Sequence, residues 1–204
     1  MINIIDLGVS NVASVANMVK KVGGTPNIIS DHSQLNTIKS NKAILPGVGS
    51  FDSAMKMLNR GNWFNSLNQY IENSSNSILG ICLGMQIMFN RSEEGQLEGL
   101  KWIDGDIRKF QFEDKKLKVP HMGWNFISPK KDDVLFQSSS ERQRFYFVHS
   151  FFASCNDKND ILSLTNYGID FVSSVQKNNI YGVQFHPEKS HRYGMHIINN
   201  FINI

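Results

Sequence analysis

The chain has 204 residues, of which 41% are hydrophobic, 11% aromatic and 19% charged, a composition typical of one globular domain. It excludes disordered, collagen-like and disulfide-dense proteins. The 21 basic and 18 acidic residues are scattered without blocks, so the sequence indicates no nucleic-acid partner and no membrane surface as partner. No apolar run approaches the roughly 20 residues of a membrane helix, and the N-terminus lacks the features of a signal peptide. We therefore expect a cytoplasmic protein whose two cysteines, Cys82 and Cys155, stay reduced.

The first half of the chain alternates short apolar runs with stretches of helical periodicity. Extended segments are predicted at 2–5, 27–29, 42–45 and 78–81, and helices at 10–22, 63–73 and 83–90. Strands that alternate with helices favour parallel pairing in a sheet that is covered on both faces.

From about residue 101 the pattern changes to a succession of short β-like runs. They lie at 107–112, 124–127, 144–152, 161–167, 171–176 and 180–185, before a final predicted helix at 195–202. We find neither an internal repeat nor a long linker. The prediction is an α/β fold in a single domain, residues 1–204, whose second half is rich in antiparallel strands.

The segment Gly80-Ile81-Cys82-Leu83-Gly84 places a thiol at the turn between a predicted strand and a predicted helix. Glycines on both sides relieve the crowding of such a turn, and the helix N-terminus directs its amides and its dipole toward the sulfur. A thiolate is thereby favoured. The alternative is a buried cysteine that serves only as a small hydrophobic residue.

The segment Val183-Gln184-Phe185-His186-Pro187-Glu188 supplies a histidine and a carboxylate at the end of an apolar run. In an extended segment, residues i and i+2 point the same way, so Glu188 is able to orient the His186 ring. With Cys82 these residues supply a nucleophile, a base and an orienting carboxylate. Taken alone, a His-Pro-Glu sequence is more typical of a surface turn.

The segment Pro46-Gly47-Val48-Gly49 follows another predicted strand, and its glycines free backbone N–H groups to form an oxyanion hole. A plain turn is the alternative. The chain contains no glycine-rich nucleotide-binding motif, and its six histidines have no cysteine partners at zinc-site spacing. We therefore expect no cofactor and no metal.

In their order along the chain, Pro46–Gly49, Gly80–Gln86 and Phe185–Glu188 resemble the motifs of the triad-type, class-I glutamine amidotransferases, which have a flavodoxin-like fold. Further segments resemble one subgroup, the glutaminase subunits of histidine biosynthesis: Asp6–Asn11, Pro120–Asn125, Tyr146–Ser150 and Lys189-Ser190. The resemblance covers almost the whole chain and is weaker over 130–142 and 153–177.

The resemblance implies that Cys82 attacks the side-chain amide of glutamine, that His186 transfers the proton to the departing ammonia and that Glu188 orients His186. It also implies an oxyanion hole from the backbone of Leu83, Val48 and Gly49, which requires the Gly47–Val48 peptide to flip. The substrate-binding residues would be Gly47, Gln86, Glu94, His149 and Ser150. For Glu93 and Glu94 the alternative is a solvated helix end.

The resemblance further implies a protein partner that uses the ammonia. This partner would be a cyclase subunit, a (β/α)8 barrel that makes imidazole glycerol phosphate and aminoimidazole carboxamide ribotide. The residues expected at or near the interface are Asn11, His121, Met122, Trp124, Asn125 and Lys189. For Trp124 a place in the core is the alternative.

Three other functions remain open from the sequence. Related glutaminase subunits serve enzymes that amidate sugars of surface polysaccharides, and residues 190–195 depart from the usual ending of the histidine-pathway subgroup. A catalytically silent regulatory subunit is disfavoured because all three triad residues are present. A stand-alone γ-glutamyl hydrolase or cysteine peptidase would share the triad, but this function does not explain the Pro120–Asn125 segment.

Overall fold

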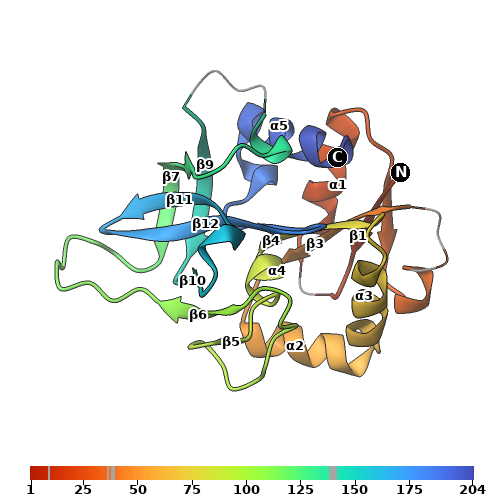
Figure 1. Cartoon of the computed structure of the whole chain (residues 1–204), viewed down its shortest axis with the longest axis horizontal. Coiled ribbons are helices and arrows are strands. Elements are labelled where there is room, and N and C mark those ends of the chain that lie inside the picture. Colours follow the sequence, from red (N-terminus) through yellow and green to blue (C-terminus); the bar gives the residue numbers. More distant parts are fainter. Residues whose placement is uncertain (9, 36, 38–39, 138–141) are drawn as a thin grey trace.

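The computed structural model describes residues 1–8, 10–35, 37, 40–137 and 142–204 (Figure 1). Its main sheet has the strand order β2-β1-β3-β4-β13-β12-β10-β6-β5. The parallel half consists of β2 (Pro26–Ile29), β1 (Ile2–Ile5), β3 (Lys42–Gly47), β4 (Ser77–Cys82) and β13 (Ile180–Val183). This arrangement confirms the parallel pairing expected for the first half of the chain.

Beyond β13 the sheet turns antiparallel, as expected for the second half of the chain. It continues through β12 (Ile169–Lys177), β10 (Phe151–Cys155) and β6 (Gly105–Lys109), and the short β5 (Arg91–Ser92) pairs in parallel with β6. Strand β11 (Ile161–Tyr167) pairs with β12 and with β8 (Ser128–Pro129). Strands β7 (His121–Phe126) and β9 (Arg144–His149) form a separate two-stranded antiparallel sheet.

Helices cover both faces of the parallel half (Figure 1). Helices α1 (Val12–Lys21) and α5 (His191–Ile202) pack on one face, and α2 (Phe51–Arg60) and α3 (Trp63–Glu72) on the other. Alternate residues of one strand therefore enter different cores: Ile4 packs under α1 and α5, and Ile5 under α2 and α3. This explains why β1 is an uninterrupted apolar run, since both of its faces are buried.

Helix α2 is absent from the sequence prediction, although Phe51, Ala54, Met55 and Leu58 are buried at helical spacing. The helix expected at 83–90 is too long. Helix α4 (Leu83–Gln86) is a single turn, after which backbone carbonyls of residues 87–90 accept hydrogen bonds from N–H groups of residues 99–103. Residues 83–89 are all buried, so their sequence shows no amphipathic pattern that would mark the end of the helix.

The single run expected at 144–152 is also wrong, because the chain changes sheets at Ser150. Strand β9 pairs with β7, whereas β10 pairs with β6 and β12. The short 3-10 helices are η1 (His32–Gln34), η2 (Val134–Phe136), η3 (Lys158–Asp160) and η4 (Pro187–Lys189). No helix among the described residues has the length and apolar character needed to span a membrane.

Candidate active site

Cys82 lies at the carboxyl end of β4, where the chain turns sharply into α4. Its φ of 54° is one that residues with a side chain rarely adopt, so the turn is strained. The flanking glycines are required by sterics. A Cβ on Gly80 would lie 2.7 Å from the Gly84 carbonyl oxygen, and a Cβ on Gly84 would overlap the carbonyl oxygen of Leu45. The local sequence thus presents a thiol at the tip of a tight strand-to-helix turn.

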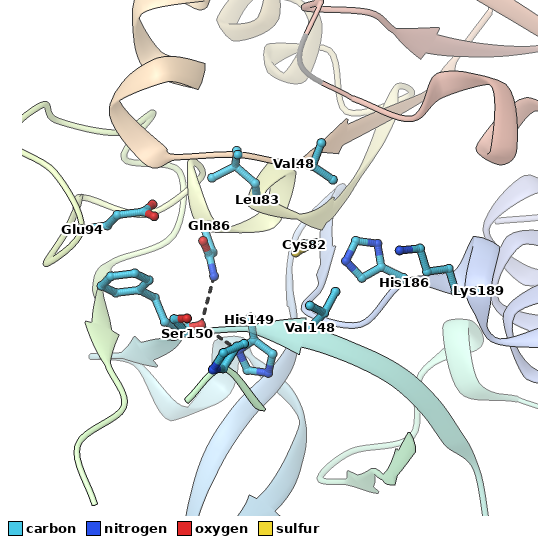
Figure 2. A pocket seen from close by; sticks show the side chains of 13 residues that line it. Val48, Cys82, Leu83, Gln86, Glu94, Val148, His149, Ser150, His186 and Lys189 are labelled. Carbon is cyan, nitrogen blue, oxygen red and sulfur yellow. Dashed lines mark hydrogen bonds between the residues drawn. The ribbon is translucent and has the colours of Figure 1, made fainter. Parts of the chain in front are cut away.

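His186 and Glu188 lie just beyond the end of β13, the strand that pairs with β4. The His186 Nδ1 donates a hydrogen bond of 2.7 Å to Oε1 of Glu188, and the two side chains are only 3% and 5% exposed. Because β4 and β13 are parallel neighbours, their carboxyl ends bring His186 beside Cys82, as Figure 2 shows. The structure thus brings together all three residues of the expected triad.

The electrostatic surroundings of His186 favour its protonated form. Burial alone lowers the pKa of His186, but hydrogen bonds to Cys82 and Glu188 and the negative charge of these two groups outweigh it and raise the pKa to about 10. Nε2, the ring nitrogen that does not face Glu188, is buried and has the Cys82 thiol, but no other hydrogen-bonding group of the described residues, within reach. It is therefore free to exchange a proton with the sulfur or with a substrate.

The expected oxyanion segment lies beside the nucleophile. Gly47 pairs with Cys82 in the sheet, and a Cβ on Gly47 would lie 2.8 Å from the Gly84 nitrogen. Val48 and Gly49 line the pocket around Cys82, Gly49 with a φ of 103°. Gly47, which was expected among the substrate-binding residues, does not line this pocket. Leu83 follows Cys82 directly and begins α4, so its backbone N–H belongs to the unpaired first turn.

A cavity of about 350 Å³ opens above Cys82 and His186 (Figure 2). Four of the expected substrate residues line it: Gln86, Glu94, His149 and Ser150. Glu94 is not simply solvated, because its Oε2 accepts a 2.7 Å hydrogen bond from the Phe51 N–H at the start of α2. Pro120, Val148, Phe151 and Lys189 complete the wall with the residues named above.

His149 belongs to a hydrogen-bonded chain that runs away from the pocket. Its Nδ1 lies 2.7 Å from the Phe151 carbonyl oxygen and its Nε2 lies 3.0 Å from Nδ1 of His121. Nε2 of His121 in turn lies 3.2 Å from the Asn125 amide nitrogen. Burial lowers the pKa of His149 to about 3 and that of His121 to about 4. Both rings are therefore neutral near pH 7.

The residues expected at a partner interface are spread between the surface and the interior. Met122 and Trp124 project from β7 and are 61% and 43% exposed, and the Trp124 ring stacks on His191. Trp124 is therefore not a core residue. Lys189 is exposed at the rim of the pocket, and Asn11 is exposed as the N-cap of α1.

The remaining two residues expected there, His121 and Asn125, lie deeper. His121 is 3% exposed. Asn125 is partly buried, and its amide nitrogen also donates to the Asn166 carbonyl oxygen at 2.9 Å. Neither side chain therefore offers a freely exposed surface.

Sequence reasoning missed Gln184, which touches the nucleophile. Its amide nitrogen lies 3.6 Å from the Cys82 sulfur. The signal was available, because Gln184 precedes His186 by two residues in an extended segment and so points the same way.

Both cysteines are free thiols, and burial raises the pKa of Cys155 to about 12, which leaves its thiol inert. Among the residues that the structure describes, no group of three or more His, Cys, Asp or Glu side chains could hold a metal ion.

Comparison with known proteins agrees with this geometry. The family model described as Glutamine amidotransferase class-I matches residues 3–204. This chain belongs to the class-I glutamine amidotransferases. It is therefore a glutamine amidotransferase with the α/β fold of that family.

Curated relatives place it within the family. It is 47% identical to "Imidazole glycerol phosphate synthase subunit HisH 2" of Methanococcus maripaludis, over 99% of this chain and 98% of the relative. It is 42% identical to the HisH subunit of Leptospira borgpetersenii over the full length of both proteins. Among solved structures, a glutamine amidotransferase superimposes with a TM-score of 0.76 at 13% identity, over 100% of this chain and 99% of the other. That likeness shows the fold alone.

Proposed function

We propose that this glutamine amidotransferase hydrolyses glutamine to glutamate and ammonia for histidine biosynthesis, with residues 1–204 acting as one domain. The observation that carries the proposal is the buried His186–Glu188 pair beside a strained Cys82 at the floor of the pocket. The triad roles of these three residues are part of the proposal. The names of the curated relatives support the histidine pathway.

In the proposed reaction, His186 holds the proton of the Cys82 thiol, because its surroundings favour the protonated ring, and the thiolate attacks the side-chain carbonyl carbon of glutamine. The tetrahedral intermediate collapses when the C–N bond breaks and His186 returns the proton to the departing ammonia, leaving a γ-glutamyl thioester. His186 then deprotonates a water molecule that attacks the thioester, and glutamate and the thiol are released. Glu188 holds the ring in the tautomer that these transfers need.

Positioning of glutamine follows from the pocket wall. Glu94 supplies a fixed carboxylate for the α-amino group, because its other oxygen is anchored on the Phe51 N–H. The Leu83 N–H faces the developing oxyanion from the start of α4. We infer that a second donor comes from the Val48–Gly49 segment after the Gly47–Val48 peptide flips.

We infer that the ammonia passes to a (β/α)8-barrel cyclase subunit. Ammonia released into water at neutral pH would be protonated and lost as a nucleophile. The face next to the pocket mouth is suited to a protein partner: Met122, Trp124 and Phe126 are exposed on one short strand, beside Arg144 and Lys189. Exposed aromatic residues with cationic neighbours are typical of interface hot spots.

Two measurements test the proposal together. The purified chain is assayed for glutamate release, alone and with a cyclase subunit and its nucleotide ligand, and Cys82→Ala serves as the blank. We expect the partner to raise turnover, and Cys82→Ala to abolish synthesis from glutamine while synthesis from ammonium salts persists. Loss of both activities in Cys82→Ala would refute the role of Cys82. A rise only with a sugar-amidating synthase would assign the polysaccharide pathway instead.

A further inference from the structure

Gln184 is fully buried, and its side chain contacts both Cys82 and Gln86. It lies at the end of β13, two residues before His186, and none of its surface is exposed. Its backbone N–H donates to the Ser173 carbonyl at 2.9 Å, which fixes the main chain. Its side-chain nitrogen lies 3.6 Å from the Cys82 sulfur, and its side-chain oxygen lies 3.0 Å from the Gln86 amide nitrogen.

One backbone carbonyl determines which way both amides point. The Gln86 amide nitrogen lies 3.1 Å from the Phe151 carbonyl oxygen, which can only accept. The same nitrogen faces the Gln184 side chain at 3.0 Å, so the atom of Gln184 on that side has to be its oxygen. The two hydrogens of Gln184 are thereby directed to the side of Cys82. A flipped Gln184 would place two N–H groups against each other in the interior.

The hydrogen bonds of His149 and His121 also require the Phe151 carbonyl oxygen to act as an acceptor. The Phe151 carbonyl also accepts from His149 Nδ1 at 2.7 Å, as drawn in Figure 2. The neutral His149 ring then accepts at Nε2 from His121, and the neutral His121 ring accepts from the Asn125 amide. Each hydrogen bond in this series therefore has one possible donor. The series through His149 and the one through Gln86 both end at the Phe151 carbonyl oxygen.

We propose that Gln184 is a further catalytic residue, which donates an N–H to the Cys82 sulfur and so stabilises the thiolate while holding it toward the pocket. Gln86 acts as a positioning residue that keeps this donor turned to the sulfur. The inference rests on the proposed role of Cys82 as nucleophile. The Gln184 amide is a neutral donor to the thiolate, in addition to the protonated His186. This donor keeps its orientation whether the sulfur is protonated or not.

A purely structural role for Gln184, tying β13 to α4, makes a different prediction. It would leave the ionisation of Cys82 unchanged as long as the protein stays folded. The decisive readout is therefore the pH dependence of Cys82 alkylation by iodoacetamide. This readout needs neither glutamine turnover nor the partner. It therefore stays informative even if the proposed function fails in the glutaminase assay.

The test uses Gln184→Met in a Cys155→Ser background, so that Cys82 is the reacting thiol. Methionine matches glutamine in length but has no N–H to donate. We expect the alkylation midpoint to rise by about one pH unit, since a hydrogen bond to a charged group changes an ionisation equilibrium by about tenfold. The other titratable groups around the sulfur, His186, Glu188, His149, Glu94 and Lys189, are the same in each variant.

Two further variants make the result decisive. Gln86→Met leaves Gln184 in place but frees its amide, and we expect a smaller rise of the midpoint in the same direction. Gln34→Met, at an exposed position in η1, is the matched control and should leave the midpoint unchanged. If Gln184→Met does not fold, Gln86→Met carries the test alone. A midpoint equal to that of the parent in the folded variants overturns the proposal.

Discussion

The His186 Nδ1 donates to Oε1 of Glu188 across 2.7 Å in a region where the two side chains are almost completely shielded from water. A carboxylate can only accept, so the proton of a neutral His186 ring is held on Nδ1. Nε2 is then the acceptor and is the nitrogen left to interact with Cys82. The pair therefore selects the tautomer that a base for a thiol requires.

Removal of the carboxylate tests this arrangement. We expect Glu188→Ala to lower partner-stimulated kcat by about 10²- to 10⁴-fold, because the base survives without its orientation. His186→Ala should cost at least about 10-fold more, since it removes the base itself. Cys155→Ser is the control and should keep full activity. A Glu188→Ala enzyme as active as the wild type would remove Glu188 from the triad. The assay is glutamate release at saturating glutamine.

The sequence was sufficient for the α/β alternation and for the positions of Cys82, His186 and Glu188 at the ends of strands, because each depends on spacing within one segment. Contacts between distant segments were not accessible in this way. The Phe51 N–H that holds Glu94 belongs to a helix that the sequence prediction lacks. The Phe151 carbonyl that orients two side chains offers no side-chain signal at all.

The turn at Cys82 predicts a conflict between stability and activity. Its φ of 54° costs little for glycine but strains any residue with a Cβ. We expect Cys82→Gly to be more stable than Cys82→Ala by about 1 kcal/mol, although both are inactive. Denaturant unfolding of the two variants measures the difference.

The matched control for this pair lies within a regular helix. At the exposed position Lys56 in α2, glycine should instead be less stable than alanine by about 1 kcal/mol. The same order of stability at both positions would show that the turn at Cys82 carries no strain.

The buried histidines predict that the protein loses stability in mild acid. Burial lowers the pKa of His121 from 6.5 to about 4 and that of His149 from 6.5 to about 3. In this range the unfolded chain binds protons that the folded protein excludes, so the free energy of unfolding falls as the pH is lowered. Each histidine contributes a slope of at most about 1.4 kcal/mol per pH unit.

The contribution of His186 to the free energy of unfolding changes over a different pH range. Its pKa is raised from 6.5 to about 10, so its contribution to stability is present below 6.5 and is lost as the pH rises toward 10. Urea unfolding measured from pH about 4 to about 6.5 therefore excludes the contribution of His186. We expect the double variant His121→Phe/His149→Phe to have a flatter profile than the wild type, since phenylalanine does not titrate. Parallel profiles would contradict the assignment.

Glu94 predicts a binding effect that its neighbour does not share. Its carboxylate lines the pocket, so Glu94→Gln should raise KM for glutamine by about 10- to 100-fold with a smaller change in kcat, as expected for loss of a charged contact to the bound substrate. Glu93 is the matched control, because its carboxylate instead accepts from the Lys109 N–H at 2.7 Å, outside this pocket. Glu93→Gln should keep the wild-type KM. Equal KM values for the two variants would remove Glu94 from the substrate site.

Trp124 predicts the location of the partner interface. Its ring is 43% exposed, lies parallel to that of His191 at a centroid distance of 5.6 Å and has the Arg144 guanidinium 5.5 Å from its centroid. A large rigid ring held in place by its neighbours loses little entropy on binding. We expect Trp124→Ala to raise the Kd for the cyclase subunit by about 10- to 100-fold in a calorimetric titration.

The control for this prediction is another exposed apolar side chain that lies far from β7. Ile28 is 48% exposed on the edge strand β2, at the opposite end of the sheet order from β10 and β6. Ile28→Ala should bind the cyclase subunit as tightly as the wild type does. If Ile28→Ala weakens binding and Trp124→Ala does not, the partner docks on the edge of the parallel half. In that case the ammonia would leave the pocket by another path than the face formed by β7.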